Sequence, residues 1–281
     1  MIKKYIRSIM RKREKSLDPD TKSHYISKKP DPAITYASLS DKGLQRTSNQ
    51  DSYGVFPEDR FAFLEPKGQL FIVADGVGGQ TGVKKTSEVA INIVRQVYFA
   101  DQTEEVSISL RRALESANEK IFHNAGSGIP FQKFGSTCTA LVLTKDHAYI
   151  AHIGDSRIYR ISNNNIEQLT QDHTEVEEKL RTGFLTKDEA KNHPERSILS
   201  RALGVELIAE VDIQENIPLR SGDYYALCTD GLGKVSPEEI KDIVLSNSPQ
   251  EACELLVQLA NQRGGEDNIT VQVVRINQTD K

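Results

Sequence analysis

Apolar positions along this sequence fall into short runs from Ile34 onward. The runs are rich in Val, Ile, Leu, Tyr and Ala, and polar or turn-forming residues bound each of them, which is typical of β-strands. Short turns such as Lys145-Asp146 and 162–165 join several runs, so we expect hairpins in antiparallel sheets. The predicted strands are ITYASLS, QLFIVAD, STCTALVLT, HAYIAHIGD, RIYRIS, VDIQENI, DYYALCTD and NITVQVVRI.

Other stretches place their apolar residues at helical spacing. One runs from Val83 to Tyr98 and a second from Val106 to Ala125. A third begins at Ser236, where Ser-Pro-Glu-Glu is a helix-start signal, and a fourth spans 248–262. The helices come in pairs instead of following each strand, which argues against a doubly wound parallel sheet. We therefore predict an α+β fold, a four-layer α-β-β-α sandwich with two packed antiparallel sheets flanked by helices.

The chain divides into three parts. Residues 1–33 are a basic extension followed by a linker with several prolines, residues 34–276 hold the periodic structure of one domain, and residues 277–281 are a tail. The extension, MIKKYIRSIMRKREK, places its apolar residues on one helical face. Two interpretations stay open: a solvated basic tail, or a helix in weak contact with an anionic membrane surface or a partner.

Composition narrows the classes of function. Of 281 residues, 37% are hydrophobic and 27% charged, and the formal net charge of -4 gives no reason to expect nucleic-acid binding. Cys138, Cys228 and Cys253 lack CxxC spacing, so neither a disulfide framework nor a zinc site is indicated, and the first two are expected to be small buried residues. No apolar stretch has the length of a transmembrane helix, and the N-terminus lacks the pattern of a secretory signal. We expect a cytoplasmic monomer, with any membrane contact peripheral and at the inner face.

Carboxylates stand at the ends of the predicted strands. A single aspartate there is most often a turn residue, because its side chain bonds the local backbone. In a sandwich, however, strand ends at one edge converge, and several such residues could share one cleft. Five aspartates have this placement: Asp51, Asp75, Asp155, Asp230 and Asp267.

If these carboxylates converge, they repel one another and must either take up protons or bind cations. The set offers oxygen donors only, which favours Mg²⁺ or Mn²⁺ over Zn²⁺. Two such ions suit phosphate-ester hydrolysis, because they lower the pKa of a water and neutralise charge on the phosphoryl oxygens. Arg46, five residues before Asp51, could add a bidentate phosphate contact.

These residues lie in motifs that point to a family. In chain order, RTSNQD, VADGVGG, FGSTCTALVL, AHIGDSR, LCTDGL and GEDNITV resemble the metal-dependent, type 2C (PPM) family of Ser/Thr protein phosphatases, in the short form common in bacteria. Each motif alone is weak, and their occurrence together in this order is specific. The resemblance covers Ile34 to Ile276, agrees with the sandwich fold, and makes residues 34–276 a phosphatase catalytic domain.

The resemblance implies the ligands of the metal ions. Asp75 would bridge two Mn²⁺ or Mg²⁺ ions, and the backbone carbonyl of Gly76 would bind one of them. Asp230 and Asp267 match carboxylate ligands of the other ion. Asp155 matches a ligand of a third, weaker ion.

The resemblance also implies catalytic roles beside the ions. Asp51 matches the acidic residue that supports a metal-bound water, so it belongs to both the catalytic and the metal set. Arg46 matches the phosphate-binding arginine. Asn268 lies next to a ligand and is expected to orient its loop.

Two positions depart from the family pattern. Gln50 stands where many members have Glu, which removes a charge near the metal ligands. Val77 stands where eukaryotic members often carry a histidine proposed as general acid, and valine cannot donate a proton. His152 is an alternative donor if it reaches the cleft, although a histidine inside an apolar strand is more often a core residue.

The polar segment 172–202 resembles the flap that lies beside the active site in this family. Within it, His193, Arg196 and Arg201 could contact a phosphoprotein, or the segment could be a solvated helical excursion.

The resemblance implies a metal-dependent protein Ser/Thr phosphatase that uses a water activated at a two-metal centre. Its partners would be phosphorylated proteins, including a Ser/Thr kinase or its substrates, a sigma-factor regulator or a secretion-system component. The alternative is a pseudophosphatase, a binding or regulatory module of the same fold, which usually lacks some of the metal aspartates.

Overall fold

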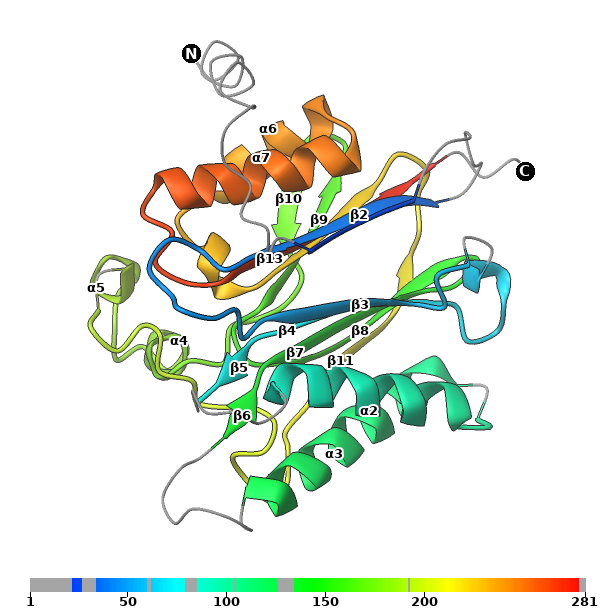
Figure 1. The fold of residues 1–281 in the computed structure, drawn as a ribbon, viewed down its shortest axis with the longest axis horizontal. Helices are drawn as coiled ribbons and strands as arrows, with labels where there is room; N and C mark the ends of the chain where they lie inside the picture. The colour runs from blue at the N-terminus through cyan, green and yellow to red at the C-terminus, as the bar shows by residue number, and fades with distance from the viewer. Residues whose placement is uncertain are drawn as a thin grey trace.

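Two antiparallel sheets lie face to face at the centre of the computed structural model (Figure 1), which describes residues 22–26, 34–59, 62–78, 85–103, 105–125, 134–191 and 193–277. The first sheet has the order β1 (Lys22–Ile26), β2 (Ile34–Asp41), β13 (Ile269–Ile276), β12 (Tyr224–Cys228), β9 (Arg157–Ser162) and β10 (Asn165–Gln168). The second has the order β11 (Asp212–Pro218), β8 (His147–Ile153), β7 (Cys138–Leu143), β4 (Gln69–Ala74) and β3 (Ser52–Phe56). A short ribbon pairs β5 (Gly76–Val77) with β6 (Gly135–Ser136).

A pair of helices covers the outer face of each sheet, as Figure 1 shows. Helices α2 (Thr86–Ala100) and α3 (Val106–Ala125) pack on the second sheet, and α6 (Pro237–Ser246) and α7 (Pro249–Gln262) pack on the first. Short helices η1 (Ala62–Leu64), α4 (Glu175–Arg181), α5 (Lys187–Lys191) and η2 (Asp230–Leu232) lie in the connections. The predicted four-layer sandwich and its helix pairs are confirmed, with the first helix observed from Thr86; Val83 lies outside the described residues.

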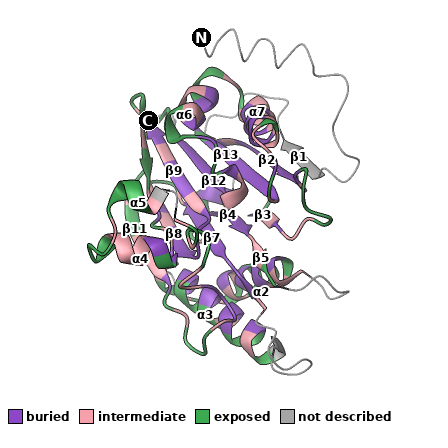
Figure 2. Cartoon of the chain, turned by 90° about the vertical axis from the view of Figure 1, so that its left-hand side faces the viewer, coloured by how far each residue is buried: buried purple, intermediate pink, exposed green. Residues whose placement is uncertain are grey.

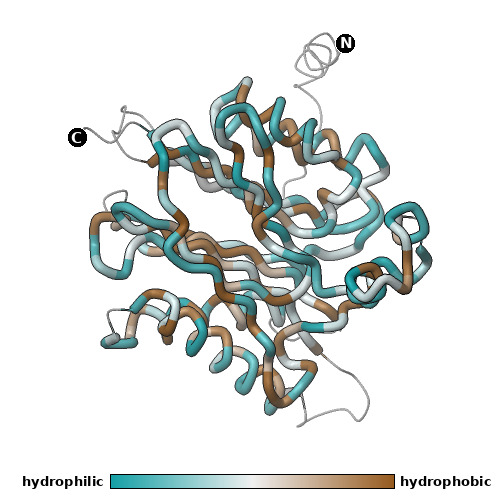
Figure 3. Tube along the Cα trace, turned by 180° about the vertical axis from the view of Figure 1, so that it is seen from behind, coloured by the Kyte–Doolittle hydropathy of each residue, from teal (hydrophilic) through white to brown (hydrophobic). Residues whose placement is uncertain are grey.

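Apolar side chains fill the three spaces between the four layers, and the buried residues follow these layers in Figure 2. Leu110 and Leu114 of α3 pack with Leu70 and Ile72 of β4, and all four side chains are fully buried. Burying one such side chain stabilises the fold by roughly 1.5–3 kcal/mol. In Figure 3 the hydrophobic colour gathers on the inner strands, while the outer helices alternate between hydrophobic and hydrophilic positions.

Local signals in the sequence determine where α6 and α7 begin. Ser236 and Ser248 each cap a helix by accepting a hydrogen bond from the backbone N–H three residues later, and the glutamate at that position bonds back to the serine. These capping boxes satisfy backbone donors that the first turn leaves unpaired. The helix starts predicted at both serines are confirmed.

The N-terminal linker contains a strand that the sequence did not predict. Residues 16–33 were expected to be irregular, but Lys22–Ile26 pairs antiparallel with β2, Lys22 opposite Ser40 and Ile26 opposite Tyr36. The outer edge of β2 offers unpaired backbone groups, and an extended segment that precedes it in the chain can pair with them. The basic stretch 1–16, for which we considered a docking helix, lies outside the described residues.

Two further expectations concern cysteines and membrane segments. Cys138, Cys228 and Cys253 are buried free thiols, so the expected burial of the first two is confirmed. Across the described ranges, we find no helix with enough length and apolar character to traverse a bilayer.

The strand register brings the functional motifs to one edge of the sandwich. In the second sheet the start of β3 lies opposite the end of β4, Ser52 facing Ala74, and the start of β7 opposite the end of β8. In the first sheet the end of β12 lies opposite the starts of β9 and β13, because Cys228 faces both Arg157 and Val271. Every strand end that carries one of the five aspartates therefore lies at this edge.

Candidate metal centre

The five aspartates follow or precede strands that end at the same edge. Asp75 directly follows β4 and Asp51 directly precedes β3, while Asp155, Asp230 and Asp267 lie within two residues of β8, β12 and β13. The predicted convergence of these strand ends is confirmed by contacts across the two sheets. Thr229 and Thr270 of the first sheet donate hydrogen bonds of 2.8 and 2.7 Å to Asp51 Oδ2.

The main chain of Asp75 is clamped from both sides by the β6–β7 segment. Its N–H donates to Thr137 Oγ1 at 2.8 Å, and its C=O accepts from Thr137 N–H and Ser136 Oγ, both at 2.9 Å. Thr137 Oγ1 also bonds Ser156 Oγ at 2.9 Å. The residue expected to bridge two ions is thus fixed by three hydrogen bonds before any ion binds.

Burial and mutual repulsion make the carboxylate cluster electrostatically unfavourable without cations. Burial first, then the charges of Asp51 and Asp230, raise the pKa of Asp75 well above its ordinary value. Burial, then Asp155 and Asp267, raise the pKa of Asp230 well above its ordinary value. Burial is also the main cause that raises the pKa of Asp51 to about 6 and that of Asp155 to about 6. A cation would relieve this repulsion.

The donor set fits a hard divalent ion. It contains oxygen ligands only, and among the described residues Asp51 Oδ1 and Asp230 Oδ1 are buried without a hydrogen-bond donor. As they stand, no three His, Cys, Asp or Glu side chains of the described ranges are close enough together to enclose an ion. One cause is visible at Asp267, whose Oδ2 lies 2.5 Å from Arg46 Nη2.

Arg46 and Asp267 therefore form an ion pair at the mouth of the cluster. The Arg46 side chain is 54% exposed and that of Asp267 is 28% exposed. Hydrogen bonding to Asp267 raises the pKa of Arg46, and Asp75 and Asp230 contribute in the same direction. The positive field of Arg46 thus reaches the buried carboxylates.

Asn268 holds the loop that carries Arg46 and Asp51. Its Nδ2 donates to the C=O groups of Lys42 and Ser48, and its Oδ1 accepts from Gln50 N–H at 2.7 Å. This agrees with the role predicted for Asn268. The Gln50 side chain bonds only locally, to Ser48 Oγ at 3.0 Å, and its C=O accepts from Gly76 N–H at 3.3 Å.

The cluster opens into a cavity of about 600 Å³ beneath the flap. Asp155, Asp230 and Asp267 line it on one side, and α4 and α5 of the flap line it on the other. Of the flap residues considered for phosphoprotein contact, Arg196 lines this cavity. His193 is not among the lining residues, and its Nδ1 accepts from Glu195 N–H at 3.2 Å.

The two side chains considered for proton donation do not serve that role in this structure. His152 is 1% exposed, and its ring nitrogens bond Thr139 Oγ1 at 2.8 Å and Gln171 O at 2.9 Å. The interpretation of His152 as a core residue is therefore confirmed. Val77 is 40% exposed in β5 beside the site.

Several residues that hold the site were not singled out from the sequence. The hydroxyls of Thr137, Thr229 and Thr270 reach Asp75 or Asp51, and Asp172 binds Arg157 through a bidentate ion pair. The threonines lie within or beside the conserved-looking runs GSTCT, LCTDG and NITV, so polar residues adjoining the aspartates were the available signal. The partner of Arg157 lies 15 residues away and has no local signal.

Fold and site together define a class of hydrolase: a sandwich with buried carboxylates for divalent ions and an arginine for an anionic substrate. The sequence matches the family described as Protein phosphatase 2C over residues 45–269. The chain belongs to this family, and it is a protein phosphatase enzyme with the expected fold.

Similar proteins extend over most of the chain. The Serine/threonine phosphatase stp of Listeria welshimeri is 38% identical over 244 residues, 85% of this chain and 94% of the relative. Protein phosphatase PhpP of Streptococcus pneumoniae is 37% identical over 248 residues, 86% of this chain and 97% of the relative.

Solved structures share the fold. The catalytic domain of PstP, in complex with two manganese ions, has a TM-score of 0.71 at 29% identity, covering 87% of this chain and 99% of that one. Stp1 from Staphylococcus aureus has a TM-score of 0.77 at 27% identity, covering 90% and 100%.

Proposed function

We propose that this chain is a metal-dependent phosphatase that removes phosphate from serine and threonine residues of proteins. The observation that carries the proposal is the cluster of buried, mutually repelling carboxylates at the floor of the cavity, with Arg46 beside it. Such a cluster is stable only with protons or cations, and two divalent ions are suited to phosphate-ester hydrolysis.

The residues present would hold two ions, Mn²⁺ or Mg²⁺. Asp75 would contact both, with the carbonyl of Gly76 on one side and Asp230 and Asp267 on the other. When bound, the ions supply a water of lowered pKa and positive charge for the phosphoryl oxygens. Asp155 is the candidate ligand for a third ion.

The side chains of the chain perform the remaining steps. Arg46 exchanges the carboxylate of Asp267 for the phosphate of the substrate, since a guanidinium binds either anion in the same bidentate geometry. That exchange also frees Asp267 to bind an ion. Asp51, held by Thr229 and Thr270, keeps an acceptor oxygen toward the cluster and can orient a water or take its proton.

The binding-module alternative is not favoured. A pseudophosphatase of this fold would be expected to have lost metal carboxylates, whereas all five aspartates are present and four of them have raised pKa values that result from their shared environment. The phosphoprotein substrates, an opposing Ser/Thr kinase and the preferred ion stay predictions.

The proposal is tested by hydrolysis of an aryl phosphate and a phosphothreonine peptide with Mn²⁺, with Mg²⁺ and with chelator. We expect turnover of both substrates with Mn²⁺ or Mg²⁺, because the carboxylates lack another source of positive charge sufficient to offset their repulsion. Chelator is expected to lower the rate to that of the buffer. Binding of the phosphopeptide without turnover under any of these conditions would favour the pseudophosphatase instead.

A further inference from the structure

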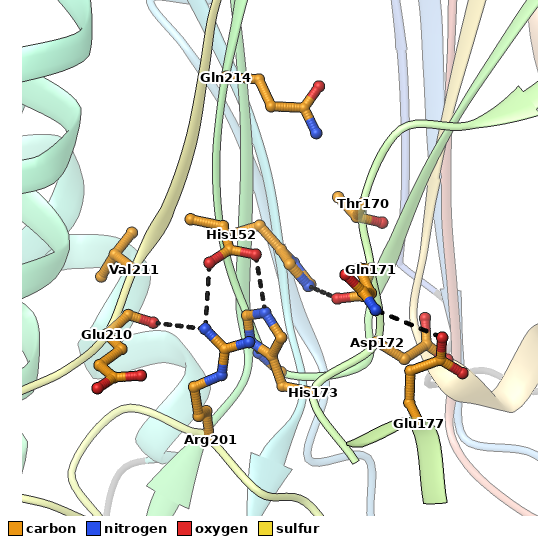
Figure 4. A network of polar contacts seen from close by, with 12 residues as sticks. His152, Thr170, Gln171, Asp172, His173, Glu177, Arg201, Glu210, Val211 and Gln214 are labelled. Carbon is orange, nitrogen blue, oxygen red and sulfur yellow. Dashed lines mark hydrogen bonds and ion pairs between the residues drawn. The ribbon is translucent and has the colours of Figure 1, made fainter. Parts of the chain in front are cut away.

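His173 lies where the flap, the Asp155 loop and the second sheet meet (Figure 4). Its side chain is fully buried. It forms two hydrogen bonds with one residue, Gly154: its main-chain N–H donates to Gly154 O at 2.7 Å, and its ring Nδ1 accepts from Gly154 N–H at 3.1 Å. Gly154 directly precedes Asp155, so His173 holds the turn that presents this carboxylate.

The hydrogen bonds determine which ring nitrogen carries the proton. Because Gly154 N–H donates to Nδ1, the proton is on Nε2, which donates to Asp212 Oδ2 in β11 at 3.1 Å. Burial lowers the pKa of His173 and favours this neutral form. Asp212 Oδ1 in turn accepts from Arg201 Nη1 at 3.1 Å. One carboxylate thus receives a bond from each end of the flap.

The flap leaves the body of the protein through a short paired neck. Ser200 N–H donates to His173 O, and Glu175 N–H donates to Ile198 O, both at 2.9 Å. Arg201 also lies 3.7 Å from Glu178 of α4. Arg201, considered from the sequence as a contact for a phosphoprotein, is therefore directed toward Asp212 and the base of the flap.

The turn held by His173 has little freedom of its own. Gly154 has φ +113°, and a Cβ there would lie 2.6 Å from Thr137 Cβ. Thr137 is the residue that clamps the main chain of Asp75. A displacement of the neck would therefore be transmitted through His173 to the Asp155 turn, which packs directly against the support of Asp75.

We propose that His173 and Asp212 are positioning residues that couple the placement of the flap to the placement of Asp155. Substrate contact on the flap and the geometry of the carboxylate cluster then depend on each other, because both are fixed to the same buried imidazole. The consequence for catalysis rests on the proposed function, whereas the mechanical coupling does not. Asp212 has a side chain that is 44% exposed, so its replacement is expected to leave the core intact.

The coupling is tested by hydrogen–deuterium exchange of the metal-free protein, comparing the parent with Asp212→Ala. The matched control is Glu215→Ala, which removes an exposed carboxylate from the same strand. Asp212→Ala is expected to accelerate exchange about tenfold both in flap peptides from 174–200 and in peptides that contain Gly154 and Asp155, as expected for sub-global opening. Glu215→Ala is expected to match the parent in both regions.

Faster exchange in the flap alone, with Gly154 and Asp155 as in the parent, would overturn the coupling, and so would unchanged exchange in both regions. A kinetic split provides a second readout. Asp212→Ala should raise KM for a phosphothreonine peptide and the Mn²⁺ concentration for half-maximal activity, each about fivefold, with a smaller change in KM for an aryl phosphate. A parent without metal-dependent turnover would contradict the proposed phosphatase and leave the exchange result interpretable.

Discussion

Replacing Asp75 with Asn is expected to abolish metal-dependent hydrolysis and, at the same time, to stabilise the metal-free protein. Loss of the bridging carboxylate should lower kcat/KM roughly 1,000-fold, which corresponds to about 4 kcal/mol of transition-state stabilisation. The main-chain clamp by Ser136 and Thr137 does not depend on the side chain and stays in place. The activity is measured with a phosphothreonine peptide in Mn²⁺.

The stability gain follows from the sign of the pKa shift. A carboxyl whose pKa is raised by folding is destabilising when ionised at neutral pH, and the amide of Asn removes that charge. A gain of about 1 kcal/mol would raise the melting temperature in chelator by ~2–4 °C for a domain of this size. Asp146→Asn, in the β7–β8 turn at the opposite edge of the same sheet, is the control and should change neither quantity. Turnover by Asp75→Asn within fivefold of the parent would contradict the assignment of Asp75.

The Gly231→Ala exchange is expected to cause the largest loss of stability. Gly231 follows Asp230, and a Cβ at this position would lie 1.9 Å from the backbone oxygen of Asn268. Backbone cannot yield as a flexible side chain does, so the two loops must separate, at a cost of about 3 kcal/mol. Because these loops carry Asp230 and Asp267, metal-dependent turnover should fall as well.

Thermal unfolding in chelator measures the effect of Gly231→Ala as a fall in melting temperature of roughly 6–12 °C. Gly222→Ala is a suitable comparison, because a Cβ there meets nothing within 4 Å and only the positive φ of +87° is unfavourable. It should cost about 1 kcal/mol and leave turnover unchanged. Equal losses in the two variants would contradict close contact between the Asp230 and Asp267 loops.

The five aspartates could be predicted because a buried strand has a regular direction. Each lies next to an apolar run, and antiparallel pairing brings the ends of such runs to one edge, so sequence position implied spatial position. The sandwich followed from the same regularity, together with the capping signals at Ser236 and Ser248. The functional assignment additionally needed the family motifs, since a carboxylate at a strand end is equally suited to a turn.

Contacts between distant segments could not be predicted in the same way. The pairing of Arg46 with Asp267 spans 221 positions and places a cation on a residue that the motifs assign to an ion. The His173–Asp212 contact depends on how the flap neck meets β11, and no periodicity encodes that. Strand β1 was missed because prolines nearby indicate a linker, whereas its pairing depends on the free edge of β2.

The claim that the strand ends form a two-metal centre is tested most directly by anomalous diffraction from crystals of the full chain grown with Mn²⁺. The account predicts two anomalous peaks on either side of Asp75, one contacted by Gly76 O and the other by Asp230 and Asp267, with Arg46 turned away from Asp267. Crystals in which the peaks lie elsewhere, or in which no peak contacts Asp75 at saturating Mn²⁺, would contradict it.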